Sequence, residues 1–309
     1  MSKPIRWDNI FTYDTLVHAI AGAAGSTFAM SVFFPLDTVR SRLQVEEYRE
    51  CKNTAAVLEE LIKEEGISTV YRGLGPVLTS LWCSNFVYFY SFHGLRAVFT
   101  RDASQHSSLR DLFLGSVAGI INVLLTTPLW VVNTRIKMQG VKLSAADREN
   151  LRRHPKYKGI FHGLLEIAQT EGAQALWAST LPSMMLVSNP AIQYMMYEAL
   201  KRRAARSNVS MNSLVIFAFG AASKVVSSCL TYPLQVVQSK LRYGASAEFQ
   251  TKSLIGMFLH ILRNQGVAGL YRGLEAKLFQ TVLTAALMLV AYEKIVKFVF
   301  HILRHSKVA

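Results

Sequence analysis

Two lysines are the residues that most strongly suggest chemistry, because they lie in or beside apolar stretches of the chain. Lys224 falls within 211–238, and Lys277 directly precedes 278–292. Charged residues at such positions are costly and usually have a function. A lysine is a point-charge partner for phosphate, and its attraction to an anion is stronger in a restricted cavity than in bulk water. We therefore predict contact with a phosphorylated anion. The alternative is snorkelling or pairing with a polar neighbour, which for Lys277 would be Glu275.

Several amides and one tryptophan lie in similar stretches. The amides are Asn85, Asn189, Gln193 and Gln280, and the tryptophan is Trp130. An amide can hydrogen-bond the polar edge of a ligand, and an indole can stack on an aromatic group. The alternative for each amide is a hydrogen bond between packed helices. For Trp130 the alternatives are packing, or a closure held by its size.

Six apolar stretches must position these residues. They are 16–34, 74–92, 112–132, 176–197, 211–238 and 278–292, and the second span is expected to run from about 74 to 99. About 20 such residues cross the hydrocarbon core of a membrane as a helix. Only 17% of the residues are charged, below the roughly 25% that is usual in a soluble domain. We predict an all-α membrane protein with six transmembrane helices. The polar residues within the stretches predict a central water-filled cavity, with polar contacts between helices as the alternative.

A motif divides the chain into three repeats. Pro-Leu, with a valine four residues after the proline, occurs at Pro35, Pro128 and Pro233. Each copy is followed by a glycine with an aromatic residue five positions later. We predict one domain, 1–309, with repeats at about 14–103, 107–206 and 209–304. Each repeat is expected to hold two membrane helices and, as at 53–64, a short amphipathic helix at the membrane interface.

The prolines predict where the cavity closes. Because each repeat has two spans, every repeat begins on the same side of the membrane. The repeats are therefore expected to be related by an axis along the membrane normal, with pseudo-threefold symmetry. Each proline is expected to kink its helix, and the three kinked helices then meet at one depth. Polar and charged side chains after the prolines would form a gate there.

Composition and motifs exclude several classes of protein. The net charge of +14 favours anionic substrates or anionic lipid surfaces, and no nucleic-acid-binding motif accompanies it. The three cysteines lack the spacing of a disulfide framework or a metal site. No GxxxxGK(S/T) or HExxH motif occurs, so we expect no enzyme. Residues 1–15 resemble neither a signal peptide nor a transit peptide, which leaves the basic clusters 148–158 and 201–206 as candidate internal targeting signals.

The triplicated frame resembles the signature of the mitochondrial carrier family over about 16–300. That signature is Pro-x-[Asp/Glu]-x-x-[Lys/Arg], then [Asp/Glu]-Gly and aromatic-[Lys/Arg]-Gly. The segments 33–38, 84–90, 126–135, 189–193 and 273–277 resemble the peroxisomal carriers of nucleotides and nucleotide-containing cofactors within that family. The resemblance implies alternating access to one central site, usually with exchange of substrates. We expect antiport of CoA, FAD, NAD, AMP, ADP and ATP across the peroxisomal membrane, with these molecules as substrates and no bound cofactor.

Several partners and alternatives accompany this interpretation. We expect contact with membrane lipid, an import receptor for peroxisomal membrane proteins, a monomeric state and no nucleic-acid partner. One alternative is a mitochondrial inner-membrane carrier of the NAD, FAD and pyrimidine-nucleotide type, which shares the tryptophan two residues after the second proline. Others are a carrier of another anion, such as a carboxylate, and a non-transporting membrane scaffold. A scaffold has no reason to bury Lys224, so the lysines argue against it.

The resemblance implies a gate at each end of the cavity, and this chain departs from the family at both. At the proline end the family pairs an acidic residue of one repeat with a basic residue of the next, but only the first repeat has both, Asp37 and Arg40. The implied contacts are Asp37 with Asn133, Trp130 with Gln238, and Gln235 with Arg40. The implied gate residues at the other end are Arg96, Glu198, Lys201 and Glu293, with one ion pair, Arg96 with Glu293. Hydrogen bonds of about 0.5–1.5 kcal/mol in place of ion pairs predict weak closures.

Substrate contacts are also implied by the resemblance. They fall near Asn85 and Tyr88, near Met185 and Leu186, and near Gln280 and Thr281. The complete set of predicted substrate-binding residues is Lys224, Lys277, Asn85, Tyr88, Asn189, Gln193, Gln280 and Trp130.

Overall fold

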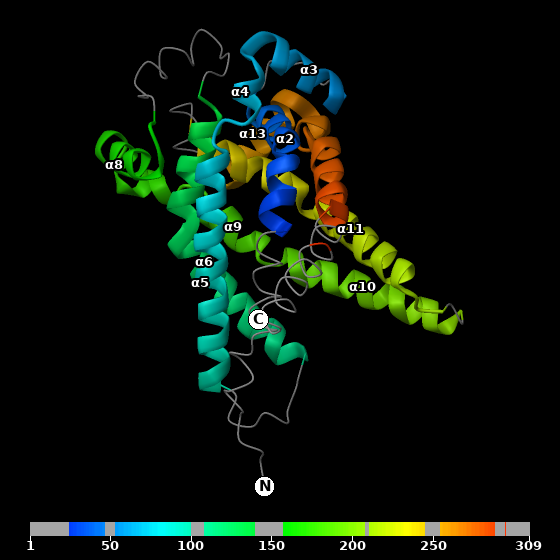
Figure 1. Ribbon diagram of the computed structural model, residues 1–309. Helices are drawn as coiled ribbons and strands as arrows, with labels where there is room; N and C mark the ends of the chain where they lie inside the picture. Colours follow the sequence, from blue (N-terminus) through cyan, green and yellow to red (C-terminus); the bar gives the residue numbers. More distant parts are fainter. Residues whose placement is uncertain are drawn as a thin grey trace, which may run out of the picture.

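The computed structural model describes residues 25–46, 53–99, 108–139, 157–207, 210–244, 254–287 and 294. All regular structure within these ranges is helical, as predicted (Figure 1). The beginning of the first predicted span (16–24) and the end of the sixth (288–292) lie outside the described residues. So do most of the basic cluster at 148–158 and Glu293.

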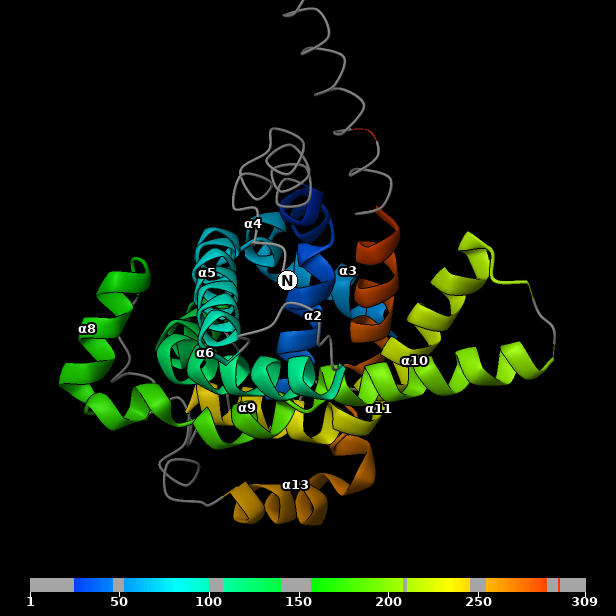
Figure 2. The ribbon, with the colours of Figure 1, turned by 90° about the horizontal axis from the view of Figure 1, so that it is seen from below.

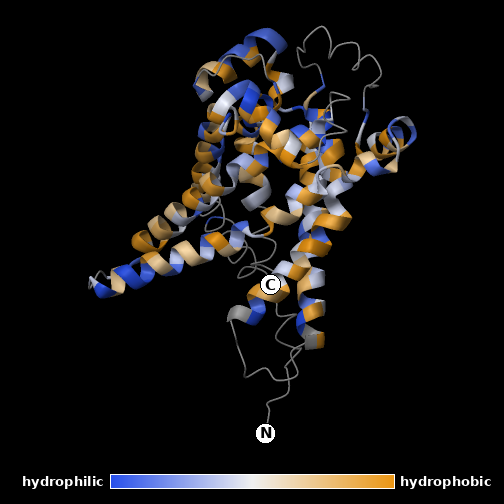
Figure 3. Ribbon diagram, turned by 180° about the vertical axis from the view of Figure 1, so that it is seen from behind, coloured by the Kyte–Doolittle hydropathy of each residue, from blue (hydrophilic) through white to orange (hydrophobic). Residues whose placement is uncertain are grey.

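Three long helices form the largest part of the fold. They are α5 (Leu74–Phe99), α6 (Ser108–Lys137) and α11 (Ser213–Tyr243). The bounds of α5 agree with the expected second span. Within the described part of the chain, Arg110–Lys137 and Leu214–Tyr243 are long and apolar enough to cross a membrane. In Figure 3 hydrophobic residues run along these helices, and Trp82, Phe86, Phe89 and Tyr90 on α5 are each at least 56% exposed. Such a surface suits contact with lipid.

The helices pack as neighbouring pairs. α5 lies along α6, and α10 (Asn189–Arg206) lies along α11. Figures 1 and 2 show α10 and the adjoining part of α11 extending together away from the other helices. α2 (Phe34–Val45) contacts both α6 and α11. The helices of the three repeats therefore meet at the end of α2, α6 and α11 that follows the prolines.

The three prolines do not act alike. The first helix is interrupted at Phe33, so that 25–32 and α2 are separate helices, with Pro35 in the first turn of α2. A proline is tolerated in a first turn because its missing N–H would have no partner there. Pro128 and Pro233 instead lie inside the continuous helices α6 and α11. The predicted kink is thus a full break in the first repeat.

The fourth predicted span is not one helix, which corrects the expectation for 176–197. The chain forms η2 (Ala173–Trp177), α9 (Thr180–Leu186) and α10, with a break at Val187 and Ser188. Pro190 explains the break, because it has no N–H to give to Leu186 and its ring would clash with that carbonyl.

Short helices pack against the helix that carries the proline motif in each repeat, namely α2, α6 or α11. They are α3 (Thr54–Glu65) with α4 (Ile67–Val70), α8 (Ile160–Thr170), and α13 (Leu254–Gly269). Each repeat has its own buried cluster at this junction: Val39 and Leu43 with Val57 and Leu61; Val131, Val132 and Ile136 with Ile167; and Val236, Val237 and Leu241 with Met257 and Ile261. The equivalent packing explains why the same apolar positions recur.

Ion pairs reinforce these junctions in two repeats. Arg42, fully buried, donates to Glu46 and Glu65, both at 3.0 Å. Arg135 makes the equivalent bidentate contact with Glu171 in the second repeat. The acidic residue before each glycine therefore clamps the short helix to the long one. The third repeat has Gln265 at this place, and both polar atoms of its side chain are buried without a hydrogen-bond partner among the described residues.

Two glycines of α6 allow neighbouring helices of the first and second repeats to approach it closely. A Cβ at Gly119 would lie 2.7 Å from Cγ1 of Val187, and one at Gly115 would lie 3.3 Å from the hydroxyl of Tyr88. α6 therefore carries small residues where α5 and the break between α9 and α10 approach it most closely, as small residues do between membrane helices.

Candidate functional site

The proline-end closure, the contacts among α2, α6 and α11 after the three prolines, forms a cycle. Lys137 on α6 donates a hydrogen bond to Asp37 on α2. Arg40 on α2 donates to Gln235 on α11 at 3.0 Å. The guanidinium of Arg242 on α11 lies 5.7 Å from the ring centroid of Trp130 on α6. Each helix is thus linked to the other two by a different kind of contact.

One expected contact of this closure is present and one is wrong. Gln235 does meet Arg40. Asn133 does not bind Asp37: both polar atoms of the Asn133 side chain are buried without a partner among the described residues. Lys137 lies one helical turn beyond Asn133, and its longer side chain reaches the carboxylate instead. The closure between α2 and α6 is therefore an ion pair and not the predicted hydrogen bond between Asp37 and the Asn133 amide.

The third expected contact, Trp130 with Gln238, is not formed, although both residues lie at the same cavity. The indole N–H of Trp130 donates to Ser84 at 3.3 Å, and Gln238 donates to Ser183 at 2.7 Å. Both residues line the same cavity. Arg242, one turn beyond Gln238, supplies the contact with the indole ring.

Sequence reasoning missed the residues that stand nine positions after each proline. They are Gln44, Lys137 and Arg242. Gln44 donates to the hydroxyl of Tyr232 at 3.0 Å and accepts from Ser239 at 2.6 Å, so it too links α2 to α11. The regular spacing was visible in the sequence. A search for every polar position that recurs in all three repeats would have found these residues.

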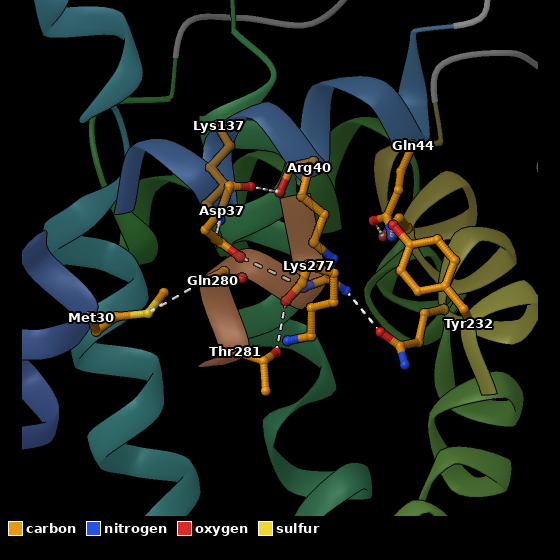
Figure 4. Close-up of polar contacts among 12 residues, drawn as sticks. Met30, Asp37, Arg40, Gln44, Lys137, Tyr232, Lys277, Gln280 and Thr281 are labelled. Atoms are coloured by element: carbon orange, nitrogen blue, oxygen red, sulfur yellow. Dashed lines mark hydrogen bonds and ion pairs between the residues drawn. The ribbon is translucent and has the colours of Figure 1, made fainter. Parts of the chain in front are cut away.

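A cluster of cations lies beside the closure. The ammonium group of Lys277 is within electrostatic range of Arg40, Lys137 and Lys224, and of the single carboxylate Asp37. Figure 4 shows Asp37, Arg40, Lys137 and Lys277 gathered around one place, contributed by α2, α6 and the helix at 274–287. The structure therefore brings both predicted lysines together with gate residues of the proline end. We call Arg40, Lys137, Lys224 and Lys277 the cation cluster.

Lys277 does not use the neighbour suggested for it. The carboxylate of Glu275 instead accepts a hydrogen bond from the backbone N–H of Thr54 at 3.0 Å. That N–H belongs to the first turn of α3, where acidic groups are favoured by the helix dipole. Glu275 thus ties the third repeat to the first, and the pairing of Glu275 with Lys277 was a wrong expectation.

The predicted amides have different environments. Asn189 donates to Thr231 at 2.7 Å and accepts from Ser227 at 3.4 Å, so it joins α10 to α11. Gln280 is buried, with its Nε2 3.8 Å from the sulfur of Met30 and its Oε1 without a partner among the described residues. Gln193 is half-buried on α10, and Asn85 is exposed on α5. Helix-to-helix contact is the role that the structure shows for Asn189.

A cavity of about 360 Å³ lies among α5, α6, α9, α10 and α11. Three of the predicted residues line it, namely Tyr88, Trp130 and Gln238, together with Arg242. No member of the cation cluster lines this cavity. The cavity and the cluster both lie beside the proline-end closure. The predicted substrate residues are thus divided between two neighbouring places.

Comparison with known proteins identifies the family. The model of the family described as mitochondrial carrier protein matches the chain three times, at residues 11–103, 104–208 and 210–302. The chain belongs to the mitochondrial carrier family. The triple repeat inferred from the sequence is confirmed by these matches.

Three relatives of this carrier carry peroxisomal names. The chain is 50% identical to the peroxisomal membrane protein PMP34 of Mus musculus, over 96% of this chain and 97% of the relative. It is 31% identical to the peroxisomal nicotinamide adenine dinucleotide carrier of Arabidopsis thaliana, over 92% of this chain and 96% of the relative. It is 29% identical to peroxisomal adenine nucleotide carrier 1 of Glycine max, over 91% of each chain. The predicted location, the peroxisomal membrane, is confirmed by these relatives.

The far end of this carrier is only partly described. Glu198 and Lys201 on α10 lie 3.7 Å apart, both within one helix. Arg96 lies near the end of α5. Its implied partner Glu293 lies outside the described residues, so the expected ion pair between them stays a prediction.

Proposed function

We propose that this carrier exchanges nucleotides and nucleotide-containing cofactors across the peroxisomal membrane by alternating access. The observation that carries the proposal is the excess of positive charge in the cation cluster. Three cations, Lys137, Arg40 and Lys277, act on the one carboxylate of Asp37, Lys224 lies within electrostatic range of Lys277, and that carboxylate is already paired with Lys137. Such a cluster attracts anions and repels cations.

Each remaining cation lacks full compensation by the carboxylates of the described residues. Arg40 hydrogen-bonds the neutral amide of Gln235, and its guanidinium lies 3.6 Å from the shared carboxylate Asp37. No ion pair joins Lys224 or Lys277 to a carboxylate among the described residues. A phosphate group would supply the missing negative charge, and burial away from water would make that attraction stronger.

The closure supports alternating access. Its contacts link α2, α6 and α11 in a cycle, which fits three repeats around a pseudo-threefold axis and six spans in total. The cycle contains one ion pair, one charged hydrogen bond and one cation–π contact. We propose that substrate binding at the cation cluster competes for these cations and so favours opening.

The substrate class rests on the cluster together with the relatives. One relative is named for nicotinamide adenine dinucleotide and another for adenine nucleotide. All such molecules carry phosphate groups and an aromatic base. We extend the proposed set to CoA, FAD, NAD, AMP, ADP and ATP, which share an adenine nucleotide portion.

Reconstituted vesicles provide the test. Purified protein is placed in liposomes loaded with AMP, and uptake of labelled AMP, ATP, CoA, NAD, FAD and citrate is measured. We expect uptake of the nucleotide-containing molecules to depend on internal AMP, because exchange couples the two directions. Uptake of citrate alone would make this a carboxylate carrier, and no uptake of any compound would favour a scaffold.

A matched pair of variants tests the cation cluster. Lys277→Gln should lower nucleotide uptake at least about tenfold, because a hydrogen bond to a charged group contributes about 1.5–3 kcal/mol. Lys63→Gln removes the same charge from the exposed surface of α3, where Lys63 pairs with Glu59. The hydrogen bond that Lys63 donates to Glu59 raises the pKa of Lys63, so this lysine is charged at neutral pH. Equal uptake by the two variants would contradict a role for the cluster.

A further inference from the structure

Arg242 is a cation that the proposed function has not yet used. Its guanidinium donates to the hydroxyls of Ser179 at 3.1 Å and Ser183 at 3.5 Å, and it lies over the ring of Trp130. All these partners are neutral, and no carboxylate contacts Arg242 among the described residues. Arg242 is half-buried, and a guanidinium partly removed from water without a counter-ion is costly unless a negative group joins it.

The departure of the second repeat from the family motif fits this environment. Where the first and third repeats have Gly73 and Gly273, the second has Ser179, which is fully buried. Its hydroxyl is the closest polar partner of Arg242. The second repeat thus holds the guanidinium in place with groups that do not neutralise it.

Arg242 faces the cavity of about 360 Å³, and the cavity follows one face of α6. That face runs from Asp111 through Asn122 to Trp130. The Oδ1 atoms of both Asp111 and Asn122 are buried and have no hydrogen-bond partner among the described residues. One end of the cavity therefore offers a cation, and the rest offers acceptors that lack donors.

The separation of these groups sets the size of an occupant. Asn122 and Trp130 are eight residues apart on one helix, which corresponds to about 12 Å. Tyr88 lies on the facing side of the cavity near Gly115. The occupant must bring an anionic group to Arg242 and a hydrogen-bond donor to Asn122, with an aromatic or apolar body between them.

We propose that Arg242 and Asn122 form the two ends of a binding subsite for an aminopurine nucleotide. Arg242 contacts a phosphate oxygen, and Asn122 accepts a hydrogen bond from the exocyclic amino group of the base. Trp130 positions Arg242 through the cation–π contact and does not itself stack the base. This subsite rests on the proposed function and adds its specificity: which part of the substrate each residue recognises.

Binding measurements on purified protein in detergent test the phosphate end. The ligands are AMP and adenosine, which differ only in the phosphate. We expect Arg242→Gln to weaken AMP binding at least about tenfold and to leave adenosine binding unchanged, while Arg242→Lys retains part of the AMP affinity. Lys63→Gln, with the same change of net charge, should alter neither ligand.

The base end is tested by removing the amino group from the ligand or the accepting amide from Asn122. Wild-type protein should bind AMP more tightly than purine riboside 5′-monophosphate, which lacks that group. Asn122→Leu, which keeps the side-chain volume, should bind the two equally. Retained discrimination in Asn122→Leu would remove Asn122 from the subsite.

The outcomes separate this inference from the proposed function. If wild-type protein binds and exchanges AMP but Arg242→Gln weakens AMP and adenosine alike, the subsite is wrong and the carrier function stands. If wild-type protein binds no nucleotide, the proposed function itself fails. Unliganded thermal unfolding of each variant shows whether it is folded, and Arg242→Lys serves as the test if Arg242→Gln does not fold.

Discussion

The ion pair between Lys137 and Asp37 decides how firmly α2 is joined to α6. Both side chains are at most 10% exposed, so removing Lys137 takes the hydrogen-bonded counter-ion from a buried carboxylate and leaves it with the longer contact to Arg40 at 3.6 Å. Such a change costs about 3–5 kcal/mol. Lys137→Ala is therefore expected to lower the midpoint of thermal unfolding strongly, measured for the purified protein in detergent.

Asn133→Ala is the control for that prediction. The family frame places Asn133 at the gate, yet its side chain has no described hydrogen-bond partner. Its removal should cost far less than that of Lys137. The double variant Asp37→Asn with Lys137→Ala should recover part of the loss, because the buried carboxylate that Lys137 neutralises is then absent. An Asn133→Ala variant as unstable as Lys137→Ala would contradict the observed pairing.

The sequence predicted some of these residues and not others. It identified Arg40 with Gln235, because the family frame names both positions. The recurring spacing could have singled out Lys137 and Arg242, but their partners could not be predicted, because these depend on side-chain length and on the distance between helices. The outcome for Glu275 has a similar cause: its neighbour in the chain is Lys277, but the first turn of α3 lies beside it in space.

Three equivalent glycines control the junction after each short helix. Gly66, Gly172 and Gly266 have φ of 84°, 89° and 64° with extended ψ, a region that is essentially limited to glycine. No atom lies within 4 Å of a Cβ built at any of them. Substitution therefore costs backbone strain alone.

Alanine at each of these glycines is expected to lower the free energy of unfolding by about 1–3 kcal/mol. Thermal unfolding of the three single variants measures the effect. Gly75→Ala is the matched control, because Gly75 lies in α5, equally open to a Cβ, and alanine favours a helix. A destabilised Gly75→Ala, or three unaffected junction variants, would show that the strain argument is wrong.

Helix bounds were predictable where apolar length alone determines them. The run after Gly73 gave the bounds of α5 correctly, since no proline interrupts it after its first turn. The stretch 176–197 was wrongly predicted to be one helix, because hydropathy alone ignores the clash between the Pro190 ring and the carbonyl of the preceding turn. The proline was visible in the sequence, and its steric effect on the preceding turn is the physical reason for two helices.

The carrier as a whole is expected to depend on Arg40 for tight coupling. Arg40→Ala removes the contact between α2 and α11 through Gln235 and weakens the closed state. We expect faster uptake of labelled AMP into vesicles that contain no nucleotide, relative to exchange in loaded vesicles. If the ratio of the two rates and the substrate selectivity stay the same, the proline-end closure does not limit access.

The overall arrangement was predictable from the triplicated motif, because three copies of one frame specify three equivalent junctions. The sequence did not predict that the three contacts would be of different chemical kinds, since this depends on which side chains meet across α2, α6 and α11. The unusual course of α10 beside α11 in Figure 2 was not predictable either. The hydrophobic periodicity of one helix does not determine the direction that a pair of packed helices takes relative to the rest of the fold.

The three unlike contacts of the proline-end closure imply an order of events. α2 is joined to α6 by an ion pair and to α11 by Arg40 and Gln44 together. α6 is joined to α11 by the Trp130 ring over Arg242 and by a hydrogen bond from Arg135 to the backbone carbonyl of Arg242 at 3.3 Å, with no ion pair between them among the described residues. A cation–π contact contributes about 0.5–2 kcal/mol, less than breaking a buried ion pair costs. The closure should therefore part first between α6 and α11, beside the cavity. A transport cycle built on three similar repeats would then proceed through an asymmetric intermediate, with one helix leaving before the other two separate.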